Sequence, residues 1–151
     1  MSGLAFAQAP PPSVPMRFLA TALAWGVVAG GGLAWHGEAA LLSRWTPATL
    51  VLVHVFALGL LGNAMLGSLV QFLPVAAGSP LPCARLVPAL HATFNLGLAL
   101  LLATLATSSH VLAIPAAVLL GGSLALFASL ALAAVARGSG LRVVRDGIGL
   151  A

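Results

Sequence analysis

The sequence predicts an all-α integral membrane protein, a bundle of four transmembrane helices. Of its 151 residues, 61% are hydrophobic and 5% are charged, and the mean hydropathy is +1.14. A soluble domain carries about 25% charged residues, so this chain cannot cover a water-facing surface with polar groups. The composition therefore excludes a soluble enzyme. Strands are not expected, because hydropathy does not alternate along the chain and four strands cannot close a barrel.

Four apolar runs define the expected helices, and each holds the roughly 20 residues needed to cross about 30 Å of hydrocarbon. They cover residues 17–35, 47–73, 86–107 and 111–136. The breaks between them read WHGEAALLSRW, PVAAGSPLPCAR and TSSH, and the first can form a short interfacial helix. The membrane domain is thus expected over residues 17–137, after a disordered proline-rich tail (1–16) and before a cytoplasmic basic tail (138–151).

The arginines predict the orientation. With four crossings, the N-terminus, the second loop and the C-terminus share a side, and that side holds Arg17, Arg85, Arg137, Arg142 and Arg145. Only Arg44 lies opposite, so the positive-inside rule places both termini in the cytoplasm and Trp35 and Trp45 at the outer interface. We expect a multi-pass protein of the cell inner (cytoplasmic) membrane. Six scattered arginines form no basic face, so a nucleic-acid partner is not expected.

Small residues recur where helices can approach closely. In the fourth run they are spaced four apart, at Ala117, Gly121, Ala125, Ser129 and Ala133. Packing within the bundle is the favoured interpretation of this stripe, and a subunit interface is the alternative. Four helices can hardly use every small-residue stripe internally, so a homo-oligomer is expected. Two amides inside the second run, Asn63 and Gln71, are expected to bridge helices.

The four histidines are the main candidates for a functional site. His36 and His110 lie at the outer ends of the first and fourth helices. His54 lies seven residues into the second helix from the outer side, and His91 five residues into the third from the cytoplasmic side. An ionisable residue inside a membrane span is a functional candidate by default, and imidazole is the commonest ligand of haem iron.

Each histidine also has a structural interpretation. His36 can be a solvated interfacial residue, His110 a helix cap, and His91 a partner in an interhelical hydrogen bond near Asn95. His54 and His91 start from opposite membrane faces and cannot bind one iron. His54 therefore needs a second His54, His110 or an exogenous ligand as its partner.

The segment from His54 to Leu81 reads HVFALGLLGNAMLGSLVQFLPVAAGSPL. It resembles the helix that carries a haem-ligating histidine in the catalytic subunits of haem–copper oxidases, especially in the nitric oxide reductase branch, and a similar helix in the NnrS family. HATFNLG, from His91, resembles the next helix more loosely. The resemblance implies that His54 is an axial ligand of haem b. Because the twelve-helix oxidase core consists of three four-helix arcs, it also implies a homotrimer of this chain.

Unlike those oxidases, the chain lacks a His-His pair and has no second histidine in the helix that resembles their ligand helix, so one chain lacks the parts for reducing oxygen or nitric oxide. We therefore expect a haem b protein, or secondarily a copper protein, acting in electron transfer, haem handling or gas sensing rather than in catalysis. The cofactor-binding candidates are His54, His91 and His110, with His54 as the metal ligand. The alternatives are an accessory or assembly subunit of a respiratory-chain complex without its own cofactor, and a small metal transporter.

Overall fold

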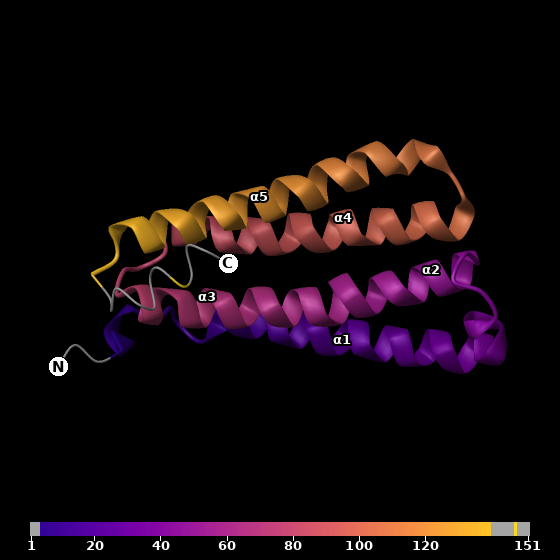
Figure 1. Ribbon diagram of the computed structural model, residues 1–151, viewed down its shortest axis with the longest axis horizontal. Coiled ribbons are helices and arrows are strands. Elements are labelled where there is room, and N and C mark those ends of the chain that lie inside the picture. The colour runs from indigo at the N-terminus through magenta and orange to yellow at the C-terminus, as the bar shows by residue number, and fades with distance from the viewer. Residues whose placement is uncertain (1–3, 140–146, 148–151) are drawn as a thin grey trace.

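The chain is all-helical in the part that the computed structural model describes, residues 4–139 and 147. Four helical segments are long and apolar enough to cross a membrane, and successive segments run in opposite directions (Figure 1). The segments are Ser13–Ala39, Pro47–Ala77, Ala84–Thr107 and His110–Arg137. The predicted four-helix membrane fold is confirmed at this level.

The helices divide into shorter elements. In chain order these are η1 (Phe6–Gln8), α1 (Ser13–His36), η2 (Gly37–Leu41), α2 (Pro47–His54), η3 (Val55–Gly62), α3 (Asn63–Ala77), η4 (Ala84–Leu86), α4 (Val87–Thr107), η5 (His110–Leu112) and α5 (Ala113–Arg137). The segment η3 is a π-helix, whereas η1, η2, η4 and η5 are 3-10 turns. Together α2, η3 and α3 form one continuous rod.

The N-terminal region differs from the expected disordered tail. Helix α1 begins at Ser13 instead of residue 17, and the backbone N–H of Ala5 donates to Val75 O at 3.1 Å, which ties the chain to the end of α3. Proline is tolerated in the first turn of a helix, where its missing N–H has no partner to lose, so Pro15 does not delay the helix. Most of the expected basic tail, with Arg142 and Arg145, lies outside the described residues.

The boundaries of the second rod follow from its sequence. Thr46 accepts a hydrogen bond from Thr49 N at 3.3 Å, and Pro47 occupies the first helical position, a typical N-cap pair. At the other end Gly78 adopts a left-handed conformation with φ of 69°, which glycine accepts without a steric penalty.

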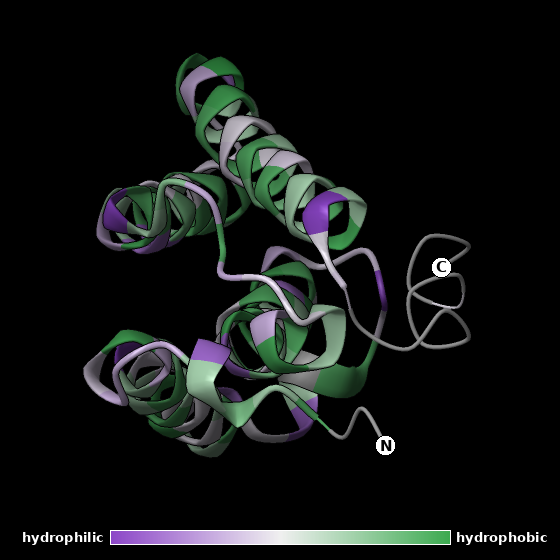
Figure 2. Cartoon of the chain, turned by 90° about the vertical axis from the view of Figure 1, so that its left-hand side faces the viewer, coloured by the Kyte–Doolittle hydropathy of each residue, from purple (hydrophilic) through white to green (hydrophobic). Residues whose placement is uncertain are grey.

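The bundle consists of two helical hairpins. Helix α1 packs along η3 and α3, and α4 packs along α5. A buried core joins them, and its largest side chains include Phe18, Val70, Leu90 and Phe94. Viewed along the bundle, hydrophobic residues also lie on its outward side (Figure 2). Such apolar faces are unfavourable in water and match the hydrocarbon of a membrane.

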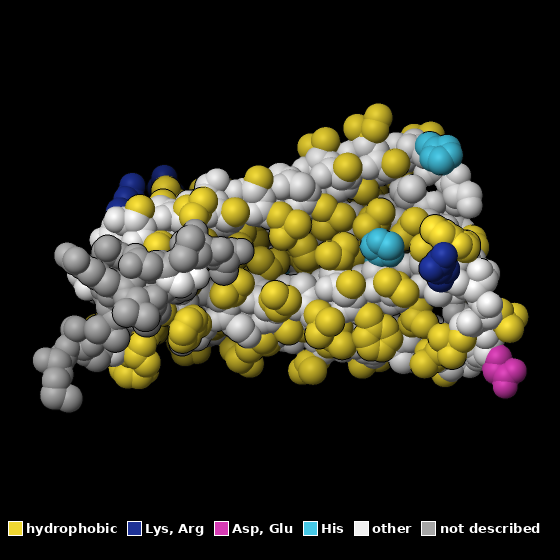
Figure 3. All heavy atoms as spheres, viewed as in Figure 1, with side chains coloured by type: hydrophobic (Ala, Val, Ile, Leu, Met, Phe, Trp, Pro, Cys, Tyr) yellow, Lys and Arg dark blue, Asp and Glu magenta, His cyan; other side chains and the backbone are white. Residues whose placement is uncertain are grey.

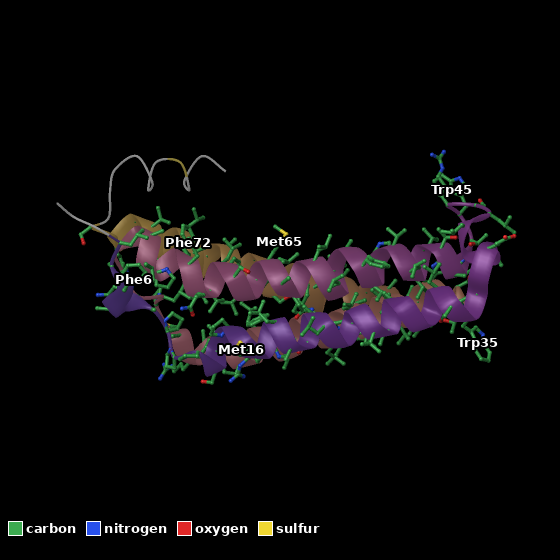
Figure 4. All side chains as sticks on the ribbon, turned by 90° about the horizontal axis from the view of Figure 1, so that it is seen from below. Phe6, Met16, Trp35, Trp45, Met65 and Phe72 are labelled. Carbon is green, nitrogen blue, oxygen red and sulfur yellow. The ribbon has the colours of Figure 1, made fainter. Side chains whose placement is uncertain are left out.

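Aromatic residues mark the end of the bundle that holds η2. Trp35 and Trp45 lie there, are mostly exposed and project outward, whereas Phe6 lies at the opposite end (Figure 4). The Arg44 guanidinium carbon lies 5.0 Å from the centre of the Trp45 ring. Arg17, Arg85 and Arg137 belong to elements at the other end. The aromatic residues and the three arginines thus separate along the bundle axis.

Glycines permit close helix contacts at three places. A Cβ added to Gly59 would lie 2.8 Å from Trp25 Cγ, and one added to Gly97 would lie 2.9 Å from Leu120 N. One added to Gly67 would lie 2.9 Å from Phe18 Cβ. These contacts join α1 to the second rod and α4 to α5.

The small-residue stripe of α5 mostly faces outward, whereas packing within the bundle was the favoured interpretation of it. Ala117, Gly121, Ala125 and Ser129 are exposed, and in the described part of the chain no atom outside the local helix backbone lies within 4 Å of a Cβ added to Gly121. Helix α5 instead buries Ala116, Ser123, Leu130 and Ala134. Packing within the chain is therefore the wrong interpretation for most of this stripe, because the buried side of α5 carries other residues.

Candidate functional site

The four histidines are spread along the bundle. His36 ends α1, His54 ends α2 and His110 opens η5, all toward one end of the molecule, whereas His91 lies in the first turns of α4 at the other end. The histidine side chains visible in Figure 3 lie apart from one another. Among the described residues, no three His, Cys, Asp or Glu side chains form a group that could hold a metal ion.

His54 is held in a defined orientation. Its Nδ1 lies 2.7 Å from Leu50 O, the carbonyl one turn earlier in α2. A carbonyl only accepts hydrogen bonds, so Nδ1 carries the proton and donates it. In the neutral ring Nε2 is then left with a free lone pair, and no hydrogen-bond partner is recorded for it within residues 4–139. The half-buried ring thus has a fixed tautomer, in which Nε2 is the acceptor nitrogen.

The helix changes its winding directly after His54. The segment η3 is π-helical over eight residues, and the side-chain amide of Asn63, which follows it, donates back to Gly59 O at 2.9 Å. Because i→i+5 winding places more residues in each turn, η3 turns His54 to a different side of the rod than a continuous α-helix would. Short π-helical segments are frequent at functional sites. The sequence pattern gave no signal for this segment.

His91 has an interhelical partner. Its Nε2 lies 2.9 Å from the Thr21 hydroxyl of α1, and its ring meets the Phe18 ring edge-on with centroids 4.8 Å apart. The Thr21 hydroxyl donates its only proton to Arg17 O at 2.7 Å, so it accepts from His91 Nε2–H. Nε2 therefore carries a proton and is engaged. This arrangement matches the interhelical hydrogen bond that was the alternative to a ligand role.

A buried polar network lies next to this pair. The amide nitrogen of Asn63 donates to Asn95 Oδ1 at 3.1 Å, and that of Asn95 donates back to Asn63 Oδ1 at 3.0 Å. The indole N–H of Trp25 also donates to Asn95 Oδ1, at 2.8 Å. Three helices, α1, α3 and α4, are thereby joined. The network satisfies polar groups that cost free energy when buried alone.

Of the two amide side chains in the second rod that were expected to bridge helices, only Asn63 does so. Asn63 is fully buried and bridges to α4 as predicted. Gln71 is exposed on α3, and no hydrogen bond is recorded for its side chain in the described part of the chain. The difference follows from the face of α3 on which each residue lies.

The Thr21–His91 hydrogen bond can be tested by removing the hydroxyl. Thr21→Val keeps the shape of the side chain, and we expect a loss of about 0.6–1.7 kcal/mol in the free energy of unfolding. Unfolding of the protein in bicelles by sodium dodecyl sulfate measures it. Thr93→Val is the matched control, because Thr93 donates only to carbonyls of its own helix at Ala89 and Leu90. Equal losses in both variants would contradict an interhelical contribution.

Comparison of the chain with protein-family models, curated proteins and solved structures finds no match.

Proposed function

We propose that this chain is a haem b-binding membrane protein in which His54 is an axial ligand of the iron through Nε2. The hydrogen bond from His54 Nδ1 to Leu50 O is the observation that supports this proposal. Histidines that bind metals characteristically donate their other ring nitrogen to a carbonyl or carboxylate, which fixes the tautomer and makes the ligand nitrogen more basic. The residues present thus fit one axial position.

The site would hold the haem through few groups. His54 is half-buried, and its neighbours on the rod, Val51, Val53 and Leu58, are apolar. Axial ligation and apolar surroundings set the reduction potential of a bound haem. The second axial position would be filled by a second His54 across an oligomer axis, by His110, or by an exogenous ligand such as a diatomic gas. A second histidine in that position would suit electron transfer, whereas an exchangeable ligand there would suit haem handling or gas sensing.

The proposal includes an assembly and an orientation. The exposed stripe of α5 is available for helix association between copies, and a homotrimer would present three His54 side chains at one depth. Arg17, Arg85 and Arg137 share one end of the bundle, which the positive-inside rule assigns to the cytoplasm. In this orientation His54 would lie in the outer half of the inner membrane.

The same exposed stripe favours a second candidate function. An accessory subunit of a respiratory membrane complex would use Ala117, Gly121 and Ala125 to pack against a partner helix, with no cofactor of its own. Copper in place of haem is a variant of the first proposal. The two functions predict different colours of the purified protein, because a haem protein absorbs visible light and a subunit without a cofactor does not.

The test is a reduced-minus-oxidised visible spectrum of the detergent-purified protein supplied with haem. We expect b-type Soret and α-bands in the wild type and a decrease of more than about tenfold in haem affinity in His54→Ala. His36→Ala is the control, because that histidine lies outside the proposed ligand set, and it should keep the bands. A wild type that stays colourless with haem and carries no copper by elemental analysis would overturn the proposal and favour the accessory subunit.

A further inference from the structure

A second, separate feature lies between α1 and α2, at the end of the bundle where η2 joins them. It is a cavity of about 460 Å³, within the size range of small-molecule sites. Val28, Ala29 and Gly32 of α1 form one wall, and Val51 and Val55 form the other. Ala39, which follows α1, and Thr46, which precedes α2, line its outer end.

The cavity is distinct from the proposed haem ligand. Its residues on the second rod, Ala48, Val51, Leu52 and Val55, follow the i, i+3, i+4, i+7 spacing of one helix face. Each residue of an α-helix turns by about 100°, so the centre of that face lies about a third of a turn from His54. His54 does not line the cavity. Ligand binding in this cavity would therefore be independent of haem binding at His54.

The cavity has one available polar side chain. Among the described lining residues, only Thr46 and His36 have polar side chains. The Thr46 hydroxyl is engaged, because it donates to Ser43 O at 3.3 Å and caps α2. His36 lines the outer end, and no hydrogen bond is recorded for its side chain within residues 4–139. A neutral imidazole offers one N–H donor. His36 marks the polar end of the cavity and Val28 the apolar end. These residues are eight positions apart on α1, so the two ends are about 12 Å apart along the helix.

We propose that this cavity binds a single-chain amphiphile, a long-chain fatty acid, with its carboxyl group at His36, the first part of its chain between α1 and α2, and the rest of the chain extending into the surrounding hydrocarbon. Protein interiors are close-packed, and the walls of an unfilled space lose their van der Waals contacts. Apolar cavities do not hold water well, because water there finds too few polar partners. The neighbouring bilayer supplies apolar chains instead. The single free donor at the outer end matches a head group with an acceptor oxygen.

Gly32 and Gly31 allow a matched test. No heavy atom lies within 4 Å of a Cβ added to either glycine, so both helix positions accept a side chain. Gly32 lines the cavity and Gly31 does not. Gly32→Phe should fill the cavity, whereas Gly31→Phe should place the same ring on the lipid side of α1. A folded, monodisperse protein is verified for both by circular dichroism and size-exclusion chromatography.

The probe is a diazirine-bearing palmitic acid in nanodiscs that contain the full chain, with cross-linked peptides mapped by mass spectrometry. We expect labelling of the peptides that hold residues 28–36 and 46–55, competition by unlabelled palmitic acid, and a decrease of about tenfold or more in Gly32→Phe but not in Gly31→Phe. His36→Ala should weaken labelling, and His36→Gln should restore part of it, because glutamine retains a donor.

Three results would overturn the proposal. The first is equal labelling of Gly32→Phe and Gly31→Phe. The second is labelling spread over all lipid-facing residues. The third is equally strong labelling of the same peptides by a phosphatidylcholine that carries the same diazirine chain, which would identify the occupant as ordinary bilayer lipid. If Gly32→Phe does not fold, the His36→Ala and His36→Gln pair decides between the outcomes.

Discussion

Replacing Asn95 with leucine is expected to lower the free energy of unfolding by about 2–4 kcal/mol. Asn95 Oδ1 accepts from both Trp25 Nε1 and Asn63 Nδ2, and Asn95 Nδ2 donates to Asn63 Oδ1. Leucine has a similar volume but no polar atoms, so Trp25 Nε1 loses its acceptor and Asn63 Oδ1 loses its donor. Steric trapping or dodecyl-sulfate unfolding in bicelles measures the change.

The control is Asn63→Leu, with a smaller expected loss of about 1–2 kcal/mol. In that variant Asn95 still accepts from Trp25 and donates to His91 O at 2.9 Å. The double variant should lose less free energy of unfolding than the sum of the losses in the two single variants. With both amides removed, neither one remains buried without its hydrogen-bond partner. An Asn95→Leu protein within about 0.5 kcal/mol of the wild type would show that the network contributes little.

Gly97→Val is expected to separate α4 from α5 and to destabilise the protein by about 2–3 kcal/mol. The Cβ alone would lie 2.9 Å from Leu120 N and 3.0 Å from Leu119 Cβ. A backbone atom cannot rotate away as a side chain can, so the helices must move and lose their contacts. Unfolding in bicelles and the distance between spin labels on α4 and α5 measure the two effects.

Gly121→Val is the matched control on the opposite side of the hairpin. No heavy atom lies within 4 Å of its added Cβ, and valine has a higher helix propensity than glycine, so the change should be within about 0.5 kcal/mol of zero or slightly stabilising. If the exposed stripe of α5 joins subunits, this variant should weaken the oligomer while the monomer stays folded. Similar unfolding of both variants would contradict the assigned packing of α5.

The membrane fold could be predicted from the sequence because it depends on composition and on the length of apolar runs. The second rod was expected to begin at residue 47, where the structure has Pro47 behind its Thr46 cap. The start of α1 was placed four residues too late, because a proline-rich segment was interpreted as a tail although Pro15 lies in the first turn of the helix. Local patterns indicate a helix well and its first turn poorly.

The candidate site was only partly predictable. The bridging role of Asn63 followed from a lone amide in an apolar run, but nothing in the sequence distinguished it from Gln71, which the structure leaves exposed. In the same way, the stripe from Ala117 to Ser129 and the single Gly97 both permit close contact, and only Gly97 has a neighbouring helix there. Spacing defines a face of a helix but not what that face contacts.

The sequence by itself determined that this protein has four apolar helices and which of its few polar residues lie inside them. It also determined how far along its helix each histidine lies. Only the tertiary structure decided which of these groups are engaged: His91 with Thr21, Asn63 with Asn95, and His54 with its own backbone. The physical reason is that hydropathy acts along one helix, whereas hydrogen bonds and close packing depend on the rotation of each helix against its neighbours. In this chain the π-helical segment after His54 sets part of that rotation.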